Sequence, residues 1–208
     1  MKFKKVLALA LSAMMAMSVL AGCGGGGGVS GSLNINEVNG LLGDVGSDIR
    51  VERDNKLDDA VRDAAAEIAS TGSTGGAESI VSNAMGWSLS NFVGSAWNDF
   101  VNGGGVMGMT VRYGRTYVIE ESRLEENSGA GILGAVNPNR GTIGKLGDVN
   151  TPEKFAAAQV LIVDGSVGQV ADWTNDLVRF EYNVSAKKAR TDNGTYWVIA
   201  AQVTAKIL

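Results

Sequence analysis

The sequence predicts an α+β fold in which an antiparallel sheet has helices packed on one of its faces. Residues 55–70 and 88–102 repeat apolar side chains with the spacing of amphipathic helices. Residues 179–206 read instead as two strands around Asp192-Asn193-Gly194, a strong signal for a tight turn. Because strands joined by a tight turn run in opposite directions, the expected sheet is antiparallel.

The N-terminus has the composition of an export signal. Three lysines lie within the first five residues, and the apolar run Val6–Leu20 is shorter than the roughly 20 residues that a permanent transmembrane helix needs. The run ends in Leu20-Ala21-Gly22-Cys23, which resembles the lipobox of bacterial lipoproteins. The resemblance implies that residues 1–22 are a signal peptide and that Cys23 is lipidated. The alternative is an ordinary signal peptide followed by an unrelated cysteine.

Residues 23–32 are expected to be a tether. Gly24–Gly28 is an unbroken glycine run, which behaves as a flexible coil. A glycine run placed directly after the lipidated cysteine resembles lipoproteins of Gram-positive clostridial bacteria. We therefore expect residues 33–208 to form a single domain at the extracytoplasmic face of the cell membrane. Its contact with the membrane is expected to be through the lipid anchor only, because an acidic chain is repelled by anionic lipid. Stable anchoring needs two or three acyl chains, since one chain alone holds only marginally.

Charge and composition exclude several classes of function. Loss of the three signal lysines takes the formal net charge from −4 to −7, which offers no electrostatic basis for binding nucleic acid. The chain has no histidine, so a Ser-His-Asp triad and imidazole metal ligands are excluded. Its single cysteine is the lipidation candidate, so no disulfide is expected. We accordingly expect no metal and no cofactor.

The remaining elements follow in order along the chain. Residues 70–76 are a Ser/Thr/Gly loop between the two helices. Residues 106–112 and 115–124 are expected to be two strands that turn at Tyr113-Gly114. Residues 125–150 form a glycine-rich connection that is long for a compact domain, so it is expected to be either a functional loop or a boundary between the two halves. Thr151-Pro152 then starts a helix, with Thr as N-cap, and a further helix is expected around residues 167–178.

The two halves of the domain, residues 55–124 and 152–208, share a pattern. Each reads as helix, helix and hairpin, and Trp97-Asn98-Asp99-Phe100-Val101 resembles Trp173-Thr174-Asn175-Asp176-Leu177-Val178 with one insertion. Gly114–Ile119 likewise resembles Gly194–Ile199. Either the halves are a duplication or the likeness follows from composition. In both cases we expect their strands to merge into one sheet, because each half alone would bury a marginal core.

The first half also resembles a degenerate CAP (SCP-like extracellular) domain. That family runs an Ala-rich helix, a Gly-Glu-Asn-Ile segment, a Trp-containing helix and a glycine-rich strand pair. The corresponding parts here are Leu57–Ser70, Ala77-Glu78-Ser79-Ile80, the helix with Trp97, and Val106–Leu124. Glu78 matches the acidic position of the family. Because the family cleft depends on histidines, the resemblance implies a domain that lacks its cation-binding cleft.

Two further motifs do not lie in the secondary structure that their functions require. Gly129-Ala130-Gly131-Ile132-Leu133-Gly134 matches a dinucleotide fingerprint, but Asn137-Pro138 follows where a helix should begin, so no nucleotide is expected. Ser185-Ala186-Lys187-Lys188 matches the Ser-x-x-Lys of penicillin-interacting enzymes. In those enzymes the motif opens a helix, whereas here it ends an expected strand.

Few residues remain as candidates for a site. Catalysis without histidine would have to rest on carboxylates, Lys, Ser or Tyr, and the weak catalytic candidates are Glu78, Glu120 and Glu121. Neighbours on a strand point to opposite faces, so Glu120 and Glu121 are not expected to line one cleft together. Trp87, which precedes the second helix in a Gly-Trp-Ser sequence, is the best candidate for an exposed aromatic that contacts a ligand.

Two functions therefore stay open. The first is a non-catalytic binding or interaction module of the cell envelope that recognises a peptide, a glycan or an envelope protein. The alternative is an envelope hydrolase that uses Glu78 with Glu120 or Glu121. Binding is favoured by the anchor, the tether, the lack of histidine and the long glycine-rich loop, whereas a hydrolase requires two carboxyl groups that face each other across a cleft.

Overall fold

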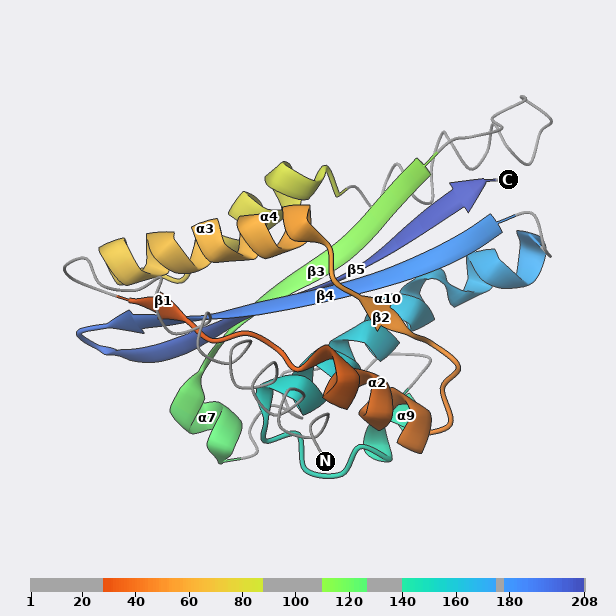
Figure 1. Cartoon of the computed structure of the whole chain (residues 1–208), viewed down its shortest axis with the longest axis horizontal. Helices are drawn as coiled ribbons and strands as arrows, with labels where there is room; N and C mark the ends of the chain where they lie inside the picture. The colour runs from red at the N-terminus through yellow and green to blue at the C-terminus, as the bar shows by residue number, and fades with distance from the viewer. Residues whose placement is uncertain (1–27, 88–109, 127–139, 175–177, 208) are drawn as a thin grey trace, which may run out of the picture.

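The computed structural model describes residues 28–87, 110–126, 140–174 and 178–207 of the chain (Figure 1). Within these ranges one sheet runs in the order β1-β4-β5-β3, and β2 pairs with β4 beside β1. Its strands are β1 Val29–Ser30, β2 Val51–Glu52, β3 Thr110–Glu120, β4 Val178–Thr191 and β5 Gly194–Ile207. All pairs are antiparallel except β2 with β4. The expected α+β class and the antiparallel character of the main sheet are confirmed.

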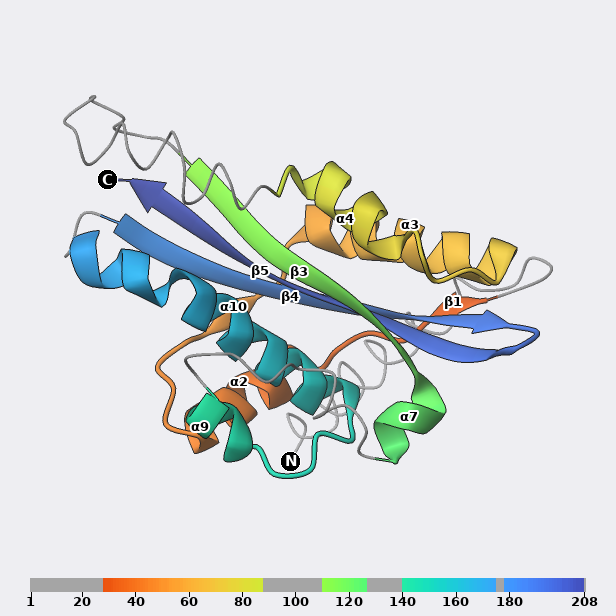
Figure 2. The same cartoon turned by 180° about the vertical axis from the view of Figure 1, so that it is seen from behind.

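Helices cover both faces of this sheet, rather than the one face that the sequence suggested (Figures 1 and 2). They are α2 Ile35–Asp44, α3 Asn55–Thr71, α4 Ala77–Met85, α7 Glu121–Glu125, α9 Arg140–Gly144 and α10 Pro152–Thr174. α3 and α4 lie on one face, and α10 and α2 lie on the other. The apolar run Val198–Ala201 of β5 is buried without interruption, as expected of a strand that is covered on both sides.

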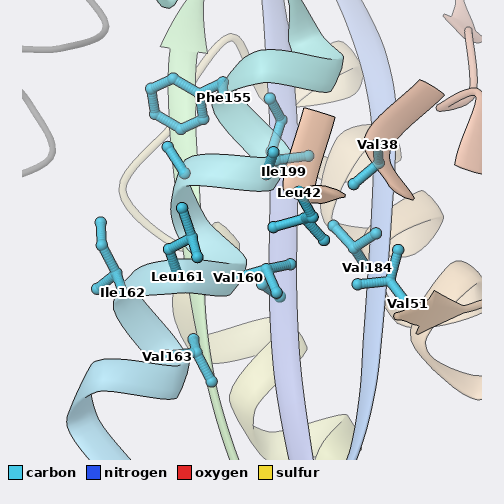
Figure 3. Packing of buried hydrophobic residues seen from close by; sticks show 14 of the residues in the cluster. Val38, Leu42, Val51, Phe155, Val160, Leu161, Ile162, Val163, Val184 and Ile199 are labelled. Atoms are coloured by element: carbon cyan, nitrogen blue, oxygen red, sulfur yellow. The ribbon is translucent and has the colours of Figure 1, made fainter. Parts of the chain in front are cut away.

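The larger part of the core lies between the sheet and α10. Phe155, Leu161 and Ile162 of α10 are buried there, together with Ile199 of β5. Figure 3 shows the side chains of α10 and α2 meeting over β4 and β5. α10 begins as the sequence predicts, because the hydroxyl of Thr151 accepts a hydrogen bond from the backbone N–H of Lys154 at 3.2 Å.

The smaller part of the core lies under α3 and α4. α3 confirms the expected helix of residues 55–70, and its inner face buries six residues: Leu57, Ala60, Val61, Ala64, Ala65 and Ile68. The side chain of Asp54 caps its first turn by accepting from the N–H of Leu57 at 3.0 Å. Gly72 ends it with φ of 70°, a left-handed conformation that glycine adopts readily. Three alanines on this face let the helix lie close to the strands.

The prediction of a hairpin over residues 106–124 is wrong. β3 is one strand that passes straight through Tyr113-Gly114, and it pairs residue by residue with Tyr196–Lys206 of β5. Gly114 has another reason to be glycine. A Cβ at this position would lie 2.4 Å from ring carbons of Trp87, so the missing side chain leaves room for an indole rather than for a turn.

The order of elements also argues against the helix–helix–hairpin repeat. In the first half two helices precede one described strand and the short helix α7, whereas in the second half the single helix α10 precedes two strands. α10 therefore replaces the two helices expected between residues 152 and 178. The strands of both halves do share one sheet. The expected helix of residues 88–102, which contains Trp97, lies outside the described residues.

Parts of the expected tether and of the expected glycine-rich connection form regular secondary structure. Val29 and Ser30 form β1 against Ala189 and Lys188, whereas the sequence predicts that they belong to the tether. The chain turns at Gly31, where a Cβ would lie 2.8 Å from the indole of Trp197. Within the connection of residues 125–150, residues 140–144 form α9 and residues 127–139 are not described. Among the helices of the described ranges, none is long and apolar enough to cross a membrane.

Candidate functional site

β3 is the outermost strand of the sheet on the side away from β1 and β4 (Figure 2). It pairs with β5 along one of its sides over 11 residues. Along its other side no strand of the described ranges is paired. On that side, the backbone N–H and C=O groups that point away from β5 form no ladder with another strand of the described ranges. We call this side the β3 edge, from Thr110 to Glu120.

A hollow of about 310 Å³ lies along the β3 edge. It is lined by Arg115, Thr116, Tyr117 and Val118 of β3 and by Glu78 of α4. Successive side chains of a strand point to opposite faces of the sheet. A hollow lined by four successive residues therefore follows the edge of the strand rather than either face, and Glu78 of α4 flanks it.

Thr116 has a polar group that is not satisfied in the described structure. The residue is only 6% exposed, and its hydroxyl oxygen is buried. No hydrogen-bond partner for that oxygen is found within the described residues. A buried hydroxyl without a partner costs free energy, commonly about 1–3 kcal/mol, so it calls for an explanation. Thr116 also lines the hollow, so a molecule bound at the β3 edge would lie close to this hydroxyl.

The charged residues of β3 form no ion pair within the described ranges. Arg112 and Arg115 are exposed and Glu120 is half-buried, and none of the three forms an ion pair there. The guanidinium carbon of Arg115 lies 5.9 Å from the ring centroid of Tyr117, within the range of a cation–π contact. The β3 edge thus presents two cations and, near its C-terminal end, one carboxylate.

Trp87 is half-buried and serves the fold rather than standing free as an aromatic surface. Its indole lies over Gly114, and its Nε1–H donates to Oε1 of Gln202 at 3.1 Å. Gln202 is 1% exposed, and its amide nitrogen donates to Asp54 at 3.2 Å and to Asn183 at 3.0 Å. This network holds the ends of α3 and α4 on the sheet. The feature of the sequence that indicates this network is the glutamine, Gln202, inside an otherwise apolar strand.

Glu121 belongs to a separate cluster on the other face of the sheet. It opens α7 and forms an ion pair with Lys188. Its Oε1 also accepts from Nε1–H of Trp197 at 3.2 Å, and the ammonium of Lys188 lies 4.9 Å from the centroid of that indole. Trp197 is only 7% exposed and packs in the core under α10. These contacts fasten α7 to the sheet.

The three candidate carboxylates do not form one cleft. Glu78 lies on α4, whereas Glu121 contacts side chains on the α10 face, so the sheet separates the two. Glu120 is cross-strand partner to Tyr196, and its carboxylate approaches Gly194 at the turn between β4 and β5. No pair of these groups is arranged across a shared pocket in the described structure. No group of three metal-ligating side chains occurs in the described ranges either.

Two other polar features lie away from the β3 edge. A shallow hollow of about 460 Å³ lies between the end of α3 and the turn of the hairpin, lined by residues 69–72 and 191–193. On the opposite face the hydroxyl of Tyr182 donates to Asp164 at 2.6 Å. Burial, followed by the nearby carboxylate, raises the pKa of Tyr182 well above its ordinary value. That tyrosine therefore stays neutral and acts as a donor.

Neither a protein-family model, nor a curated protein, nor a solved structure matches this chain.

Proposed function

We propose that this chain is a membrane-anchored, non-catalytic binding lipoprotein of the bacterial cell envelope, and that it binds its partner through the β3 edge. The observation that carries the proposal is the hollow along the outer side of β3, which pairs with no strand of the described ranges; the hollow is lined by Arg115–Val118 and Glu78. An exposed strand binds an extended segment through main-chain hydrogen bonds, and hollows beside it select the side chains. The partner supplies the neighbouring strand that β3 does not have among the described residues.

The position of the expected anchor is compatible with such binding. The chain enters the sheet at β1, which lies on the far side of β4 from β3. The segment between Cys23 and Val29 spans at most roughly 20 Å when fully extended. A lipidated Cys23 would therefore hold the β1 side of the sheet near the lipid surface. The β3 edge is at the opposite side of the sheet and stays available to a partner.

The carboxylates support binding over hydrolysis. Asp54 caps α3 and accepts from Gln202, and Asp58 accepts from Ser185. Glu121 is held by Lys188 and Trp197. Each of these acids is used to join elements of the fold. Glu78 is the exposed candidate, and among the described residues that line its hollow, Arg115–Val118, none carries a second carboxylate. The resemblance to CAP domains stays a prediction.

The anchor is tested by replacing Cys23 with alanine in the full chain. We expect Cys23→Ala to abolish incorporation of labelled palmitate and to move the protein from the membrane fraction to the soluble fraction, or to leave the signal peptide uncleaved. The reason is that without the sulfur there is no atom to acylate, and a lipid chain contributes about 0.8 kcal/mol per buried methylene. A variant that is processed and retained like the wild type would refute the anchor.

The binding edge is tested by site-specific photo-cross-linking in cells. A photoreactive amino acid at Arg115 should give a discrete adduct, because this residue lines the hollow on the β3 edge. The matched control is the same amino acid at Arg190, which is exposed on β4 near the opposite side of the sheet. The measurement is the gel shift of the full chain after irradiation. Equal adducts at both positions, or none at Arg115, would contradict the proposal.

A further inference from the structure

The charges of β3 are self-complementary in one register. Arg112 and Glu120 are both at even positions of the strand, on the side of Thr116 and of α4. They stand at equal distances from Thr116, four residues before it and four after it. A strand with this pattern pairs favourably with an antiparallel copy of itself.

Symmetry limits how two copies of an antiparallel strand can meet. A pair of identical partners is normally related by a two-fold axis, and the same surface is then used by both. Side chains directly opposite each other in an antiparallel pair lie on the same face of the sheet. The axis must therefore pass through a single residue position, with each residue before it facing the equivalent residue after it in the other copy.

The position of the axis decides which charges meet. An axis at Arg115 would place two arginines directly opposite each other, which destabilises a strand pair. An axis at Thr116 instead places Arg112 of each copy opposite Glu120 of the other, so two opposite-charge pairs form. In this register Arg115 faces Tyr117, with which it already makes a cation–π contact inside one chain. Thr116 faces its own equivalent.

The orphaned hydroxyl fits the same register. Thr116 is buried beside the hollow without a hydrogen-bond partner in the described part of the chain. Cross-strand threonine pairs hydrogen-bond to each other, because a hydroxyl both donates and accepts. A hydrogen bond between the two Thr116 hydroxyls would give each oxygen the partner that it does not have among the described residues. The hollows of the two copies would then adjoin, since each is lined by Arg115–Val118.

We propose that the partner of the β3 edge is a second copy of this chain, and that two β3 strands pair antiparallel about a two-fold axis at Thr116 to form one continuous sheet. This inference rests on the proposed function, because it names the partner of the same edge. A second copy is favoured over a foreign peptide because the charge pattern of β3 complements itself.

A single cysteine at the axis tests the register. Directly opposite residues have Cα atoms about 4.5–5.5 Å apart, which a disulfide can bridge. We expect the full chain with Thr116→Cys to form a covalent dimer under mild oxidation. The matched control, Val118→Cys, shares the strand and face, but the two cysteines would lie roughly 13 Å apart along the sheet. The wild-type chain, oxidised in parallel, reports on Cys23.

Charge reversal tests the pairing itself. Arg112→Glu should weaken self-association at least roughly tenfold, because two attractive pairs become two repulsive ones. The double variant Arg112→Glu/Glu120→Arg should restore it, and Arg190→Glu, on an exposed residue of β4, should leave it unchanged. Association is measured by analytical ultracentrifugation of the full chain in detergent. Circular dichroism confirms that each variant is folded.

Each outcome decides the inference. Cross-linking at residue 116 with loss and rescue by the charge variants supports it. A monomer at all concentrations, a dimer indifferent to Arg112→Glu, failure of the double variant to restore association, or cross-linking at 118 instead of 116 overturns it. If the photo-adduct at Arg115 contains a different protein and no second copy, this inference fails while the proposed function stands. If no adduct forms there, both fail.

Discussion

Phe155→Ala is expected to lower the free energy of unfolding by about 3–5 kcal/mol, the range seen when a buried phenylalanine is truncated in a well-packed core. Phe155 is fully buried near the start of α10, where it joins the helix to β3. Its ring meets the ring of Tyr117 edge to face, with centroids 6.0 Å apart. The variant removes this contact and leaves a cavity under the strand that carries the candidate site.

The measurement is urea denaturation of the mature chain at neutral pH, with the slope of the transition compared between variants. The matched control is Phe180→Ala on β4, since Phe180 is half-buried at the border of the same core. It should cost less than half as much, because part of its ring is already in water. Equal losses for the two variants would show that Phe155 is not the packing centre that its burial indicates.

Gly114→Ala is expected to destabilise the protein by about 1–3 kcal/mol or more, although alanine is larger by a single methyl group. The new Cβ would lie 2.4 Å from two ring carbons of Trp87 and 2.7 Å from the carbonyl oxygen of Ala201. The backbone oxygen cannot move aside without breaking the pairing of β3 with β5. The indole can move only by giving up its hydrogen bond to Gln202.

A glycine in the middle of a helix provides the matched control. Gly40 lies within α2, and a Cβ there meets no atom within 4 Å. Gly40→Ala should therefore stabilise the protein by roughly 0.5–1 kcal/mol, because alanine loses less backbone entropy on folding into a helix. Thermal denaturation of both variants checks the opposite signs. Gly114→Ala with unchanged stability would mean that Trp87 does not occupy the space over the strand.

Opposite signs for the same chemical change illustrate why a glycine is hard to interpret from sequence alone. Tyr113-Gly114 suggested a turn, because glycine between two β-rich segments is a common turn signal. The glycine is instead required by a tryptophan 27 positions earlier in the chain, at Trp87. The need for a residue without a Cβ at position 114 comes from a contact between distant segments. The residues next to Gly114 in the sequence therefore do not reveal it.

The candidate site was found only in part for a similar reason. Glu78 was singled out from the sequence and does line the hollow, but its neighbours Arg115–Val118 were not. Those residues matter because β3 is the outermost strand. The alternation of apolar and polar residues along one strand does not show where that strand lies in the sheet. Trp87 was expected to be exposed, since the sequence does not show that Gln202 reaches its indole nitrogen.

The sequence by itself determined those elements that depend on interactions between residues close together in the chain. They include α3 from its apolar spacing, the start of α10 at Thr151-Pro152, and the hairpin turn at Asp192-Asn193-Gly194. Tertiary structure alone decided that helices cover both faces, that β3 runs unbroken at the outside of the sheet, and that Val29–Ser30 joins β4. The physical reason is that caps, turns and periodic apolar faces depend on neighbouring residues, whereas strand order and close packing depend on which distant segments fill the same space.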